Sequence, residues 1–163
     1  MTLIGLLLFA SACFGEAGAT EASDCTDGDV TACKNLCDND NAAACNNLGA
    51  FHAMGKGVKQ DYFKAVELFT KACEIADVCE NLGQAYAMGK GVKQDFFKAF
   101  DYLTQGCDND SSGSCYKLGW MYQDGKGVRQ SHRNALKYFG KACDLRDQLG
   151  CDEYAKLKKS GVD

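Results

Sequence analysis

CNNLGAFHAMGKGVKQDYFKAVELFTKAC, which occupies residues 45–73, is followed by two close variants of itself. Residues 79–107 read CENLGQAYAMGKGVKQDFFKAFDYLTQGC, and residues 115–143 read CYKLGWMYQDGKGVRQSHRNALKYFGKAC. The string Gly-Lys-Gly-Val that they share recurs at 55–58, 89–92 and 125–128, at spacings of 34 and then 36 residues. A repeat of this length without strand-like alternation predicts an array of helical hairpins.

Each unit divides into two helices, helix A and helix B, which are joined by the Gly-Lys-Gly turn. Helix A of the first unit has one face of residues at i, i+3, i+4 and i+7, namely Cys45, Leu48, Gly49 and His52. The glycine of that face has no side chain where helix B must approach closely. The two turn glycines can adopt positive φ, so the turn is expected to end helix A.

Helix B follows the turn and is expected to begin at a capping residue. The predicted N-caps are Asp61, Asp95 and Ser131, whose side-chain oxygens can accept hydrogen bonds from the first turn of a helix. The predicted buried face of the first helix B consists of Ala65, Leu68, Phe69 and Ala72. The predicted fold is therefore all-α, an α/α-hairpin repeat solenoid with a core of small and aromatic side chains.

The repeats occupy most of one predicted domain, residues 20–163. We expect an N-terminal cap at 28–44, repeats at 45–78, 79–114 and 115–147, and a C-terminal capping helix at 148–163. Residues 1–19 are interpreted as a signal peptide, because the apolar stretch Leu3–Ala12 is followed by small residues. Cys13 lies inside this segment. It leaves with the signal peptide or, in the alternative, becomes the lipidated first residue of an outer-membrane-anchored lipoprotein.

Composition narrows the class of protein. The chain has 163 residues, a net charge of −4, no proline and 11 cysteines. The longest run of basic residues is the pair Lys158-Lys159, so a nucleic-acid partner is not expected. The apolar stretch at the N-terminus is shorter than the roughly 20 residues that span a bilayer. The high cysteine content indicates an oxidising compartment or a metal protein.

The ten cysteines after the leader allow two simple pairing schemes. The first joins neighbours: Cys25–Cys33, Cys37–Cys45, Cys73–Cys79, Cys107–Cys115 and Cys143–Cys151. The second joins the two ends of each hairpin, but it leaves four cysteines unpaired. Spacing alone does not decide connectivity, and we favour the first scheme because it uses all ten. A zinc site is disfavoured, because only Cys33 and Cys37 approach the usual ligand spacing. No metal or other cofactor is expected.

The motifs C-x-x-L-G-x-x-Y, G-K-G-V and K-A-x-x-x-[YF]-x-x-A-C resemble the cysteine-rich branch of the Sel-one-like repeats, relatives of the tetratricopeptide repeat. The most similar group is the Helicobacter cysteine-rich protein family, and the resemblance covers about residues 25–157. It implies secreted or periplasmic α-solenoids in which cysteines eight positions apart form disulfides. Several members are described as penicillin-binding proteins or slow β-lactamases, and other repeat proteins of this type are adaptors. The chain departs from the pattern in its short 73–79 link, its irregular 25–45 start and His52.

Catalytic candidates are weak. Ser114-Cys115-Tyr116-Lys117 matches S-x-x-K, which makes Ser114 and Lys117 the candidate nucleophile and base of a β-lactamase. No S-D-N or K-T-G string accompanies it, and Cys115 is assigned to a disulfide. His52 and His132 are the only histidines, too few for a zinc hydrolase.

A binding groove has more support. In stacked hairpins the A helices line the concave face, so the residues just after each core cysteine are expected to face a ligand. These are Asn46, Asn47 and Ala50, then Glu80, Asn81 and Gln84, then Tyr116, Lys117 and Trp120. Trp120 is the only tryptophan and suits stacking against a peptide or glycan, unless it packs against the capping helix instead.

Three hypotheses follow for the function. The favoured one is a monomeric, secreted or periplasmic module that binds a peptide, a protein or a peptidoglycan fragment in its concave groove. The alternative is a weak β-lactamase, which rests on the family resemblance. A third is an assembly factor of the mitochondrial intermembrane space, although cysteine pairs there are more often nine residues apart.

Overall fold

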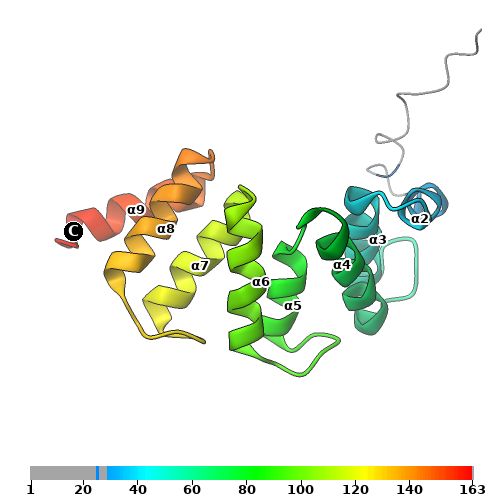
Figure 1. Ribbon diagram of the computed structural model, residues 1–163, viewed down its shortest axis with the longest axis horizontal. Helices are drawn as coiled ribbons and strands as arrows, with labels where there is room; N and C mark the ends of the chain where they lie inside the picture. The colour runs from blue at the N-terminus through cyan, green and yellow to red at the C-terminus, as the bar shows by residue number, and fades with distance from the viewer. Residues whose placement is uncertain (1–24, 26–28, 163) are drawn as a thin grey trace, which may run out of the picture.

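The computed structural model describes Cys25 and residues 29–162, and these residues form eight helices and no strands. The predicted signal peptide at 1–19 and Cys13 lie outside the described residues. Successive helices run up and down and stack along the long axis of the molecule (Figure 1). The bounds are α2 Val30–Asp38, α3 Ala42–Met54, α4 Tyr62–Ala76, α5 Glu80–Met88, α6 Phe96–Asp108, α7 Ser112–Asp124, α8 His132–Asp144 and α9 Gln148–Lys159. The prediction of an all-α, α/α-hairpin solenoid is confirmed.

The Gly-Lys-Gly turns end each helix A as the sequence predicts. All six turn glycines have φ between 67° and 74°. The second glycine has a further role, because the turn of one repeat rests on the start of helix B in the repeat before it. A Cβ atom at Gly91 would collide with the carbonyl oxygen of Tyr62, and one at Gly127 would collide with that of Phe96. The turn therefore also holds neighbouring repeats together.

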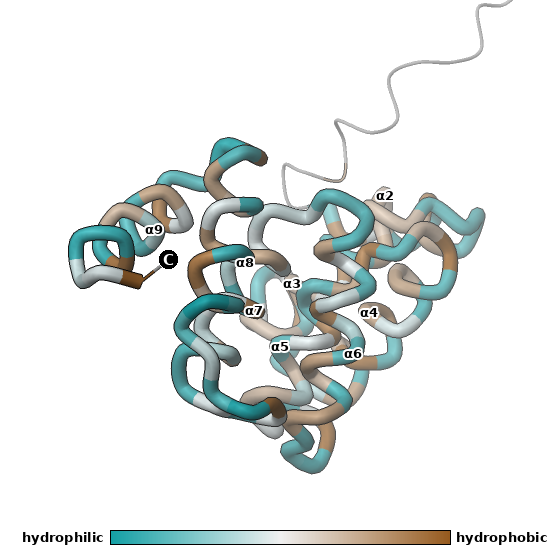
Figure 2. The backbone as a smooth tube through the Cα atoms, turned by 60° about the vertical axis from the view of Figure 1, so that its left-hand side comes forward, coloured by the Kyte–Doolittle hydropathy of each residue, from teal (hydrophilic) through white to brown (hydrophobic). Residues whose placement is uncertain are grey.

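Each hairpin closes over the glycine of helix A. A Cβ atom at Gly49 would lie 2.6 Å from the Phe69 ring, and Gly119 meets the Phe139 ring in the same way. The predicted buried face of the first helix B is confirmed, since Ala65, Leu68, Phe69 and Ala72 are all buried. The predicted N-caps are confirmed too, because Asp61, Asp95 and Ser131 accept hydrogen bonds from backbone N–H groups in the first turn. Figure 2 shows hydrophobic and hydrophilic residues alternating along the helices, as this packing requires.

Five disulfides join neighbouring cysteines, in the consecutive order that uses all ten: Cys25–Cys33, Cys37–Cys45, Cys73–Cys79, Cys107–Cys115 and Cys143–Cys151. The last four of these close the links between one helix and the next. Each of those links contains one non-glycine residue in the left-handed conformation: Asp40, Asp77, Asp110 or Arg146. In the regular links the next residue caps the following helix. Asn41, Ser111 and Asp147 do so, and the helix begins before its cysteine.

The link between α4 and α5 is shorter and lacks this cap. Cys79 occupies the N-cap position of α5 and makes no side-chain capping bond. Helix α5 has 9 residues, whereas α3 and α7 have 13 each. The predicted repeats begin at Cys45, Cys79 and Cys115, whereas helices α3 and α7 begin earlier, at Ala42 and Ser112. No helix in the described part of the chain is long and apolar enough to cross a membrane.

Candidate functional site

The A helices of successive repeats lie side by side and share a polar face. The Nδ2 atom of Asn81 donates a hydrogen bond to Oδ1 of Asn46 at 2.9 Å. One repeat further on, Nζ of Lys117 pairs with Oε1 of Glu80 at 2.6 Å, and the Ser111 hydroxyl donates to Oε2 of Glu80 at 2.9 Å. Four of the predicted groove residues therefore contact one another across the two junctions. These bonds join the A helices of neighbouring repeats.

Trp120 contacts the third hairpin itself. Its ring lies 5.8 Å from the ring of Phe139 and 6.3 Å from that of Tyr116, edge-on in both cases. Phe139 is fully buried, so Trp120 covers the core at this end of the solenoid and remains only partly exposed. Trp120 therefore packs against helix α8. Tyr116, Trp120 and Phe139 thus form one aromatic cluster within the third hairpin.

A pocket of about 300 Å³ lies at the junction of the first and second repeats. Its walls come from α3, α4, α5 and the turn after α5: Ala50, Ala53, Met54, Tyr62, Ala65, Val66, Phe69, Asn81, Gln84, Ala85, Met88 and Lys90. Three members of the predicted groove, Ala50, Asn81 and Gln84, are among them, while Asn46, Asn47, Glu80, Tyr116, Lys117 and Trp120 are not. Four of the lining residues are alanines, and their short side chains leave this space unfilled.

Polar groups stand at the rim of this pocket. The ammonium group of Lys90 lies 5.4 Å from the centre of the Tyr62 ring, a distance at which the ring attracts the cation. The Tyr62 hydroxyl oxygen accepts a hydrogen bond from Nε2 of Gln60 at 3.0 Å. Met54 and Met88 are more than half exposed and form flexible apolar walls. The arrangement can hold an apolar side chain in the pocket and a carboxylate or carbonyl group at its rim.

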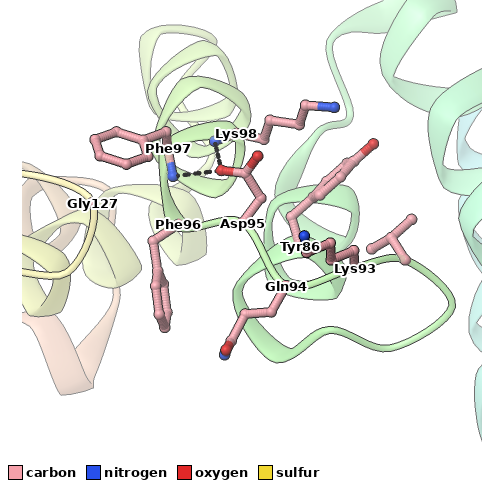
Figure 3. A pocket seen from close by; sticks show the side chains of 9 residues that line it. Tyr86, Lys93, Gln94, Asp95, Phe96, Phe97, Lys98 and Gly127 are labelled. Carbon is pink, nitrogen blue, oxygen red and sulfur yellow. Dashed lines mark hydrogen bonds between the residues drawn. The ribbon is translucent and has the colours of Figure 1, made fainter.

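A wider hollow of about 620 Å³ lies beside the turn of the second repeat (Figure 3). Asp95 is not free to bind a ligand there, because its carboxylate accepts the N–H groups of Phe97 and Lys98 at 3.0 and 3.1 Å. Lys98 extends over the Tyr86 ring at 5.3 Å, while the Phe97 ring points to the opposite side. The hollow is a surface depression with basic and aromatic walls.

The structure does not bring Ser114 and Lys117 together as a nucleophile and its base. Ser114 is fully buried, and its hydroxyl makes no hydrogen bond. Its side chain fills the space that Gly106 leaves, and the Lys117 ammonium is held by Glu80. A serine nucleophile needs a neighbouring base and access for substrate. Ser114 has neither in this conformation.

The two histidines lie apart. His52 is half-buried in α3, while His132 is exposed at the start of α8. At the His52 position the later repeats have tyrosines that stack on helix B, as Tyr122 does on Tyr138 at 5.4 Å. Burial, with a smaller effect of Tyr122 and Asp108, raises the pKa of Tyr138. Within Cys25 and residues 29–162, no three His, Cys, Asp or Glu residues gather as metal ligands.

One recurring contact escapes sequence reasoning. The residue two positions before the last cysteine of each hairpin reaches back to the preceding link. Lys71 donates to the Cys37 carbonyl at 2.8 Å, Lys141 to the Cys107 carbonyl at 2.6 Å, and Gln105 to Asp77. The sequence does contain a signal, because a long polar residue stands at this position in all three repeats. Sequence reasoning also missed Met54 and Met88 as pocket walls. The signal for them is that Asp124 stands at the equivalent position of the third repeat.

Comparisons with known proteins agree with this architecture. The Sel1 repeat model matches residues 42–77, 76–111 and 112–147. The chain is similar to Helicobacter pylori cysteine rich protein B, with 28% identity and a TM-score of 0.61 over 83% of this chain and 97% of that one. It is also similar to a protective antigen of uropathogenic Escherichia coli strains that displays an SLR fold, with 29% identity and a TM-score of 0.75. That match covers 82% of this chain and 29% of the antigen.

A Sel1 repeat protein from Oxalobacter formigenes shares the fold at 20% identity, with a TM-score of 0.76 over 88% of this chain and 62% of that one. The chain thus spans less than two thirds of the Escherichia and Oxalobacter proteins. No curated protein matches it. The resemblance expected from the C-x-x-L-G and G-K-G-V motifs is confirmed, and the disulfides indicate an extracytoplasmic protein. With three matched repeats between residues 42 and 147, the chain belongs to the Sel1 repeat family.

Proposed function

We propose that the chain is a secreted or periplasmic binding module that receives an extended peptide at the junction of its first and second repeats. The observation that carries this proposal is the 300 Å³ pocket between α3, α4 and α5. Sel1 repeats commonly mediate protein interactions, and this pocket offers a place for one. The peptide belongs to a partner protein or to the stem of a peptidoglycan fragment.

The size and chemistry of the pocket favour a short peptide segment. Its volume is at the lower end of the range for ligand sites, about 300 to 1,000 Å³, so it suits one or two side chains. The walls are mostly apolar, while the Gln84 amide and the Lys90 ammonium supply polar partners for a peptide backbone or carboxylate. An aliphatic side chain followed by a carboxylate fits this combination.

The second junction suits this role less well. The residue equivalent to Gln84 is Trp120, which packs against Phe139, and the residue equivalent to Asn81 is Lys117, which is paired with Glu80. Both groups are already engaged within the protein. The first junction therefore has the open walls and the polar groups that a ligand needs.

The test is a binding assay with fluorescein-labelled tripeptides that have free C-terminal carboxylates, together with peptidoglycan stem peptides as a second set. Ala53→Trp fills the pocket, and Gln84→Ala removes one amide without adding bulk. We expect Kd to rise at least about tenfold in the first variant and about fivefold in the second. Asn47→Ala is the matched control, because Asn47 is on α3 with Ala53 but outside the pocket, and this variant should bind as the wild type does.

Two results would contradict the proposal: no tripeptide or stem peptide binds the oxidised protein, or both pocket variants bind as tightly as the control. Circular dichroism of each variant checks that it is folded. For β-lactam hydrolysis the structure offers no comparable support, because Ser114 is buried and has no base beside it.

A further inference from the structure

Charges are separated onto two opposite edges of the solenoid. The turn edge consists of residues 55–60, 89–94 and 125–130 with the first turns of the B helices that follow, and the link edge consists of residues 38–41, 74–78, 108–111 and 144–147. In Figure 1 the turns after α5 and α7 lie at the bottom, and the links that follow α4, α6 and α8 lie at the top. The turns themselves contain only basic charged residues: Lys56, Lys59, Lys90, Lys93, Lys126 and Arg129. The links contain eight acidic residues and one basic residue, Arg146.

The basic side chains of the turn edge are nearly all without an acidic partner. Lys126 pairs with Asp124, and no other basic residue of the turns forms an ion pair within the described part of the chain. All six are exposed. The acidic residues beside two of the turns, Asp61 and Asp95, point their carboxylates at backbone N–H groups as N-caps. The turn edge therefore presents a net positive charge to solvent, because its basic residues outnumber the neighbouring carboxylates of Asp61, Asp95 and Asp124.

Two phenylalanines project from the same edge. Phe63 and Phe97 are the second residues of α4 and α6, and their side chains are 78% and 73% exposed. Each follows a basic turn directly, with Lys59 and Lys93 four positions earlier. In the third repeat Arg133 stands at this position. The exposed aromatic residues thus belong to repeats 1 and 2, and the hollow lined by Lys93, Phe97 and Lys98 lies between such a turn and the next repeat (Figure 3).

We propose that the turn edge of repeats 1 and 2 docks onto a bilayer surface that contains anionic lipids. Lysines near such a surface are attracted to the headgroups, each strengthening binding roughly fivefold, and aromatic rings insert at headgroup level. The acidic link edge on the opposite side is repelled by the same surface, so the protein would bind in one orientation. This proposal does not rest on the peptide site, although the turn edge shares Tyr62 and Lys90 with the wall of that pocket.

The exposed rings of Phe63 and Phe97, which follow lysine-containing turns, favour a lipid surface over a second copy of this chain as the partner. The link edge of a second copy would satisfy the lysines, but it would place carboxylates and exposed carbonyl groups against the Phe63 and Phe97 rings. Removing those polar groups from water without hydrogen-bond partners is unfavourable. A lipid headgroup region offers phosphates for the lysines and acyl chains for the rings.

The test is co-sedimentation of the oxidised protein with vesicles of phosphatidylcholine alone and of phosphatidylcholine with an equal amount of phosphatidylglycerol. We expect binding to the anionic vesicles only, weakened by added salt. Lys59→Glu with Lys93→Glu should lower the partition coefficient at least about tenfold. Lys156→Glu with Lys159→Glu on α9 changes the net charge equally and should lower it by less than about threefold.

A second pair of variants tests the aromatic contribution. Phe63→Ser with Phe97→Ser should lower the partition coefficient about tenfold or more, whereas Ile75→Ser with Leu149→Ser, two exposed apolar residues away from the turn edge, should leave it unchanged. The proposal is overturned if anionic vesicles bind no protein, or if both charge variants weaken binding equally. It is also overturned if the protein self-associates through the turn edge without binding vesicles, which light scattering of the Lys59→Glu with Lys93→Glu variant would reveal.

Discussion

At the junction between the first and second repeats the link from Cys73 to Cys79 spans six positions, whereas the link from Cys107 to Cys115 at the next junction spans eight. The longer link contains Ser111, which caps α7, and the shorter one leaves α5 without a side-chain cap. Both links still place one aspartate in the left-handed conformation. The chain thus follows the same path with two residues fewer, but α5 lacks the first helical turn that α7 has.

The side chains at the two junctions differ in a matching way. The first junction has one amide pair, Asn46 with Asn81, and an open pocket with Gln84 in its wall. At the second, the carboxylate of Glu80 is bound to two partners, and Trp120, the counterpart of Gln84, packs on Phe139 of its own hairpin. One backbone arrangement therefore supports a junction with an open pocket and another whose polar side chains are paired with each other. Repeat proteins gain binding sites in this way, because each interface can change without altering the others.

The largest effect is expected where the two junctions are alike, at the second glycine of the turn. Gly91→Ala and Gly127→Ala each force an alanine into positive φ and against a carbonyl oxygen of the preceding repeat. Each should lower the free energy of unfolding by about 3 kcal/mol, measured by urea denaturation. Gly89→Ala has the positive φ with a nearest atom at 3.1 Å and should cost about 1 kcal/mol. Equal losses for all three would show that the turn does not hold the repeats together.

Removing a disulfide should affect the two junctions differently. Each link closes a short loop, so replacing both cysteines by alanine should cost roughly 2 kcal/mol at either one. The local consequences should differ, because α7 keeps the Ser111 cap and α5 has none. Hydrogen exchange at Leu82 and Gly83 should therefore speed up more in Cys73→Ala/Cys79→Ala than exchange at Leu118 and Gly119 does in Cys107→Ala/Cys115→Ala. A larger change at α7 would contradict the importance assigned to the cap.

Much of the fold could be predicted because the information is local. The spacing of Cys45, Leu48 and Gly49 defines a buried helix face, and Asp61 defines the start of the next helix. The early start of α7 could not be read in the same way. It depends on Ser111, which lies inside a disulfide link, where chain geometry rather than periodicity decides the conformation.

The site was harder to predict because it depends on contacts between distant residues. Asn46 and Asn81 are on one face, as the sequence suggests, yet each finds its partner in the other, 35 positions away. Glu80 and Lys117 pair across 37 positions. Sequence reasoning places such residues on a face but does not tell whether a side chain there binds its neighbour or a ligand.

Substituting the residues that distinguish the junctions should have an effect of similar or smaller size. Trp120→Ala removes the ring that covers Phe139 and should lower the free energy of unfolding by about 2 kcal/mol, less than for a fully buried tryptophan. Gln84→Ala, at the equivalent position, should change it by less than about 0.5 kcal/mol while weakening peptide binding. Thermal unfolding and the tripeptide assay on both variants measure these effects. If Trp120→Ala weakens peptide binding and leaves stability unchanged, the second junction is the binding site.

The smallest effect concerns the polar pairs that join the A helices of neighbouring repeats. A double-mutant cycle of Glu80→Ala and Lys117→Ala should give a coupling energy of about 1 kcal/mol, since both side chains are about one-third exposed or less and the pair spans two helices. The cycle of Asn46→Ala and Asn81→Ala should give about 0.5 kcal/mol, because two neutral amides exchange one hydrogen bond with water. Salt should reduce the first coupling and leave the second unchanged. Equal couplings with the same salt response would mean that the ion pair stabilises the second junction no more than the amide pair stabilises the first. The difference between the two junctions would then rest on Gln84 and the alanines that line the pocket.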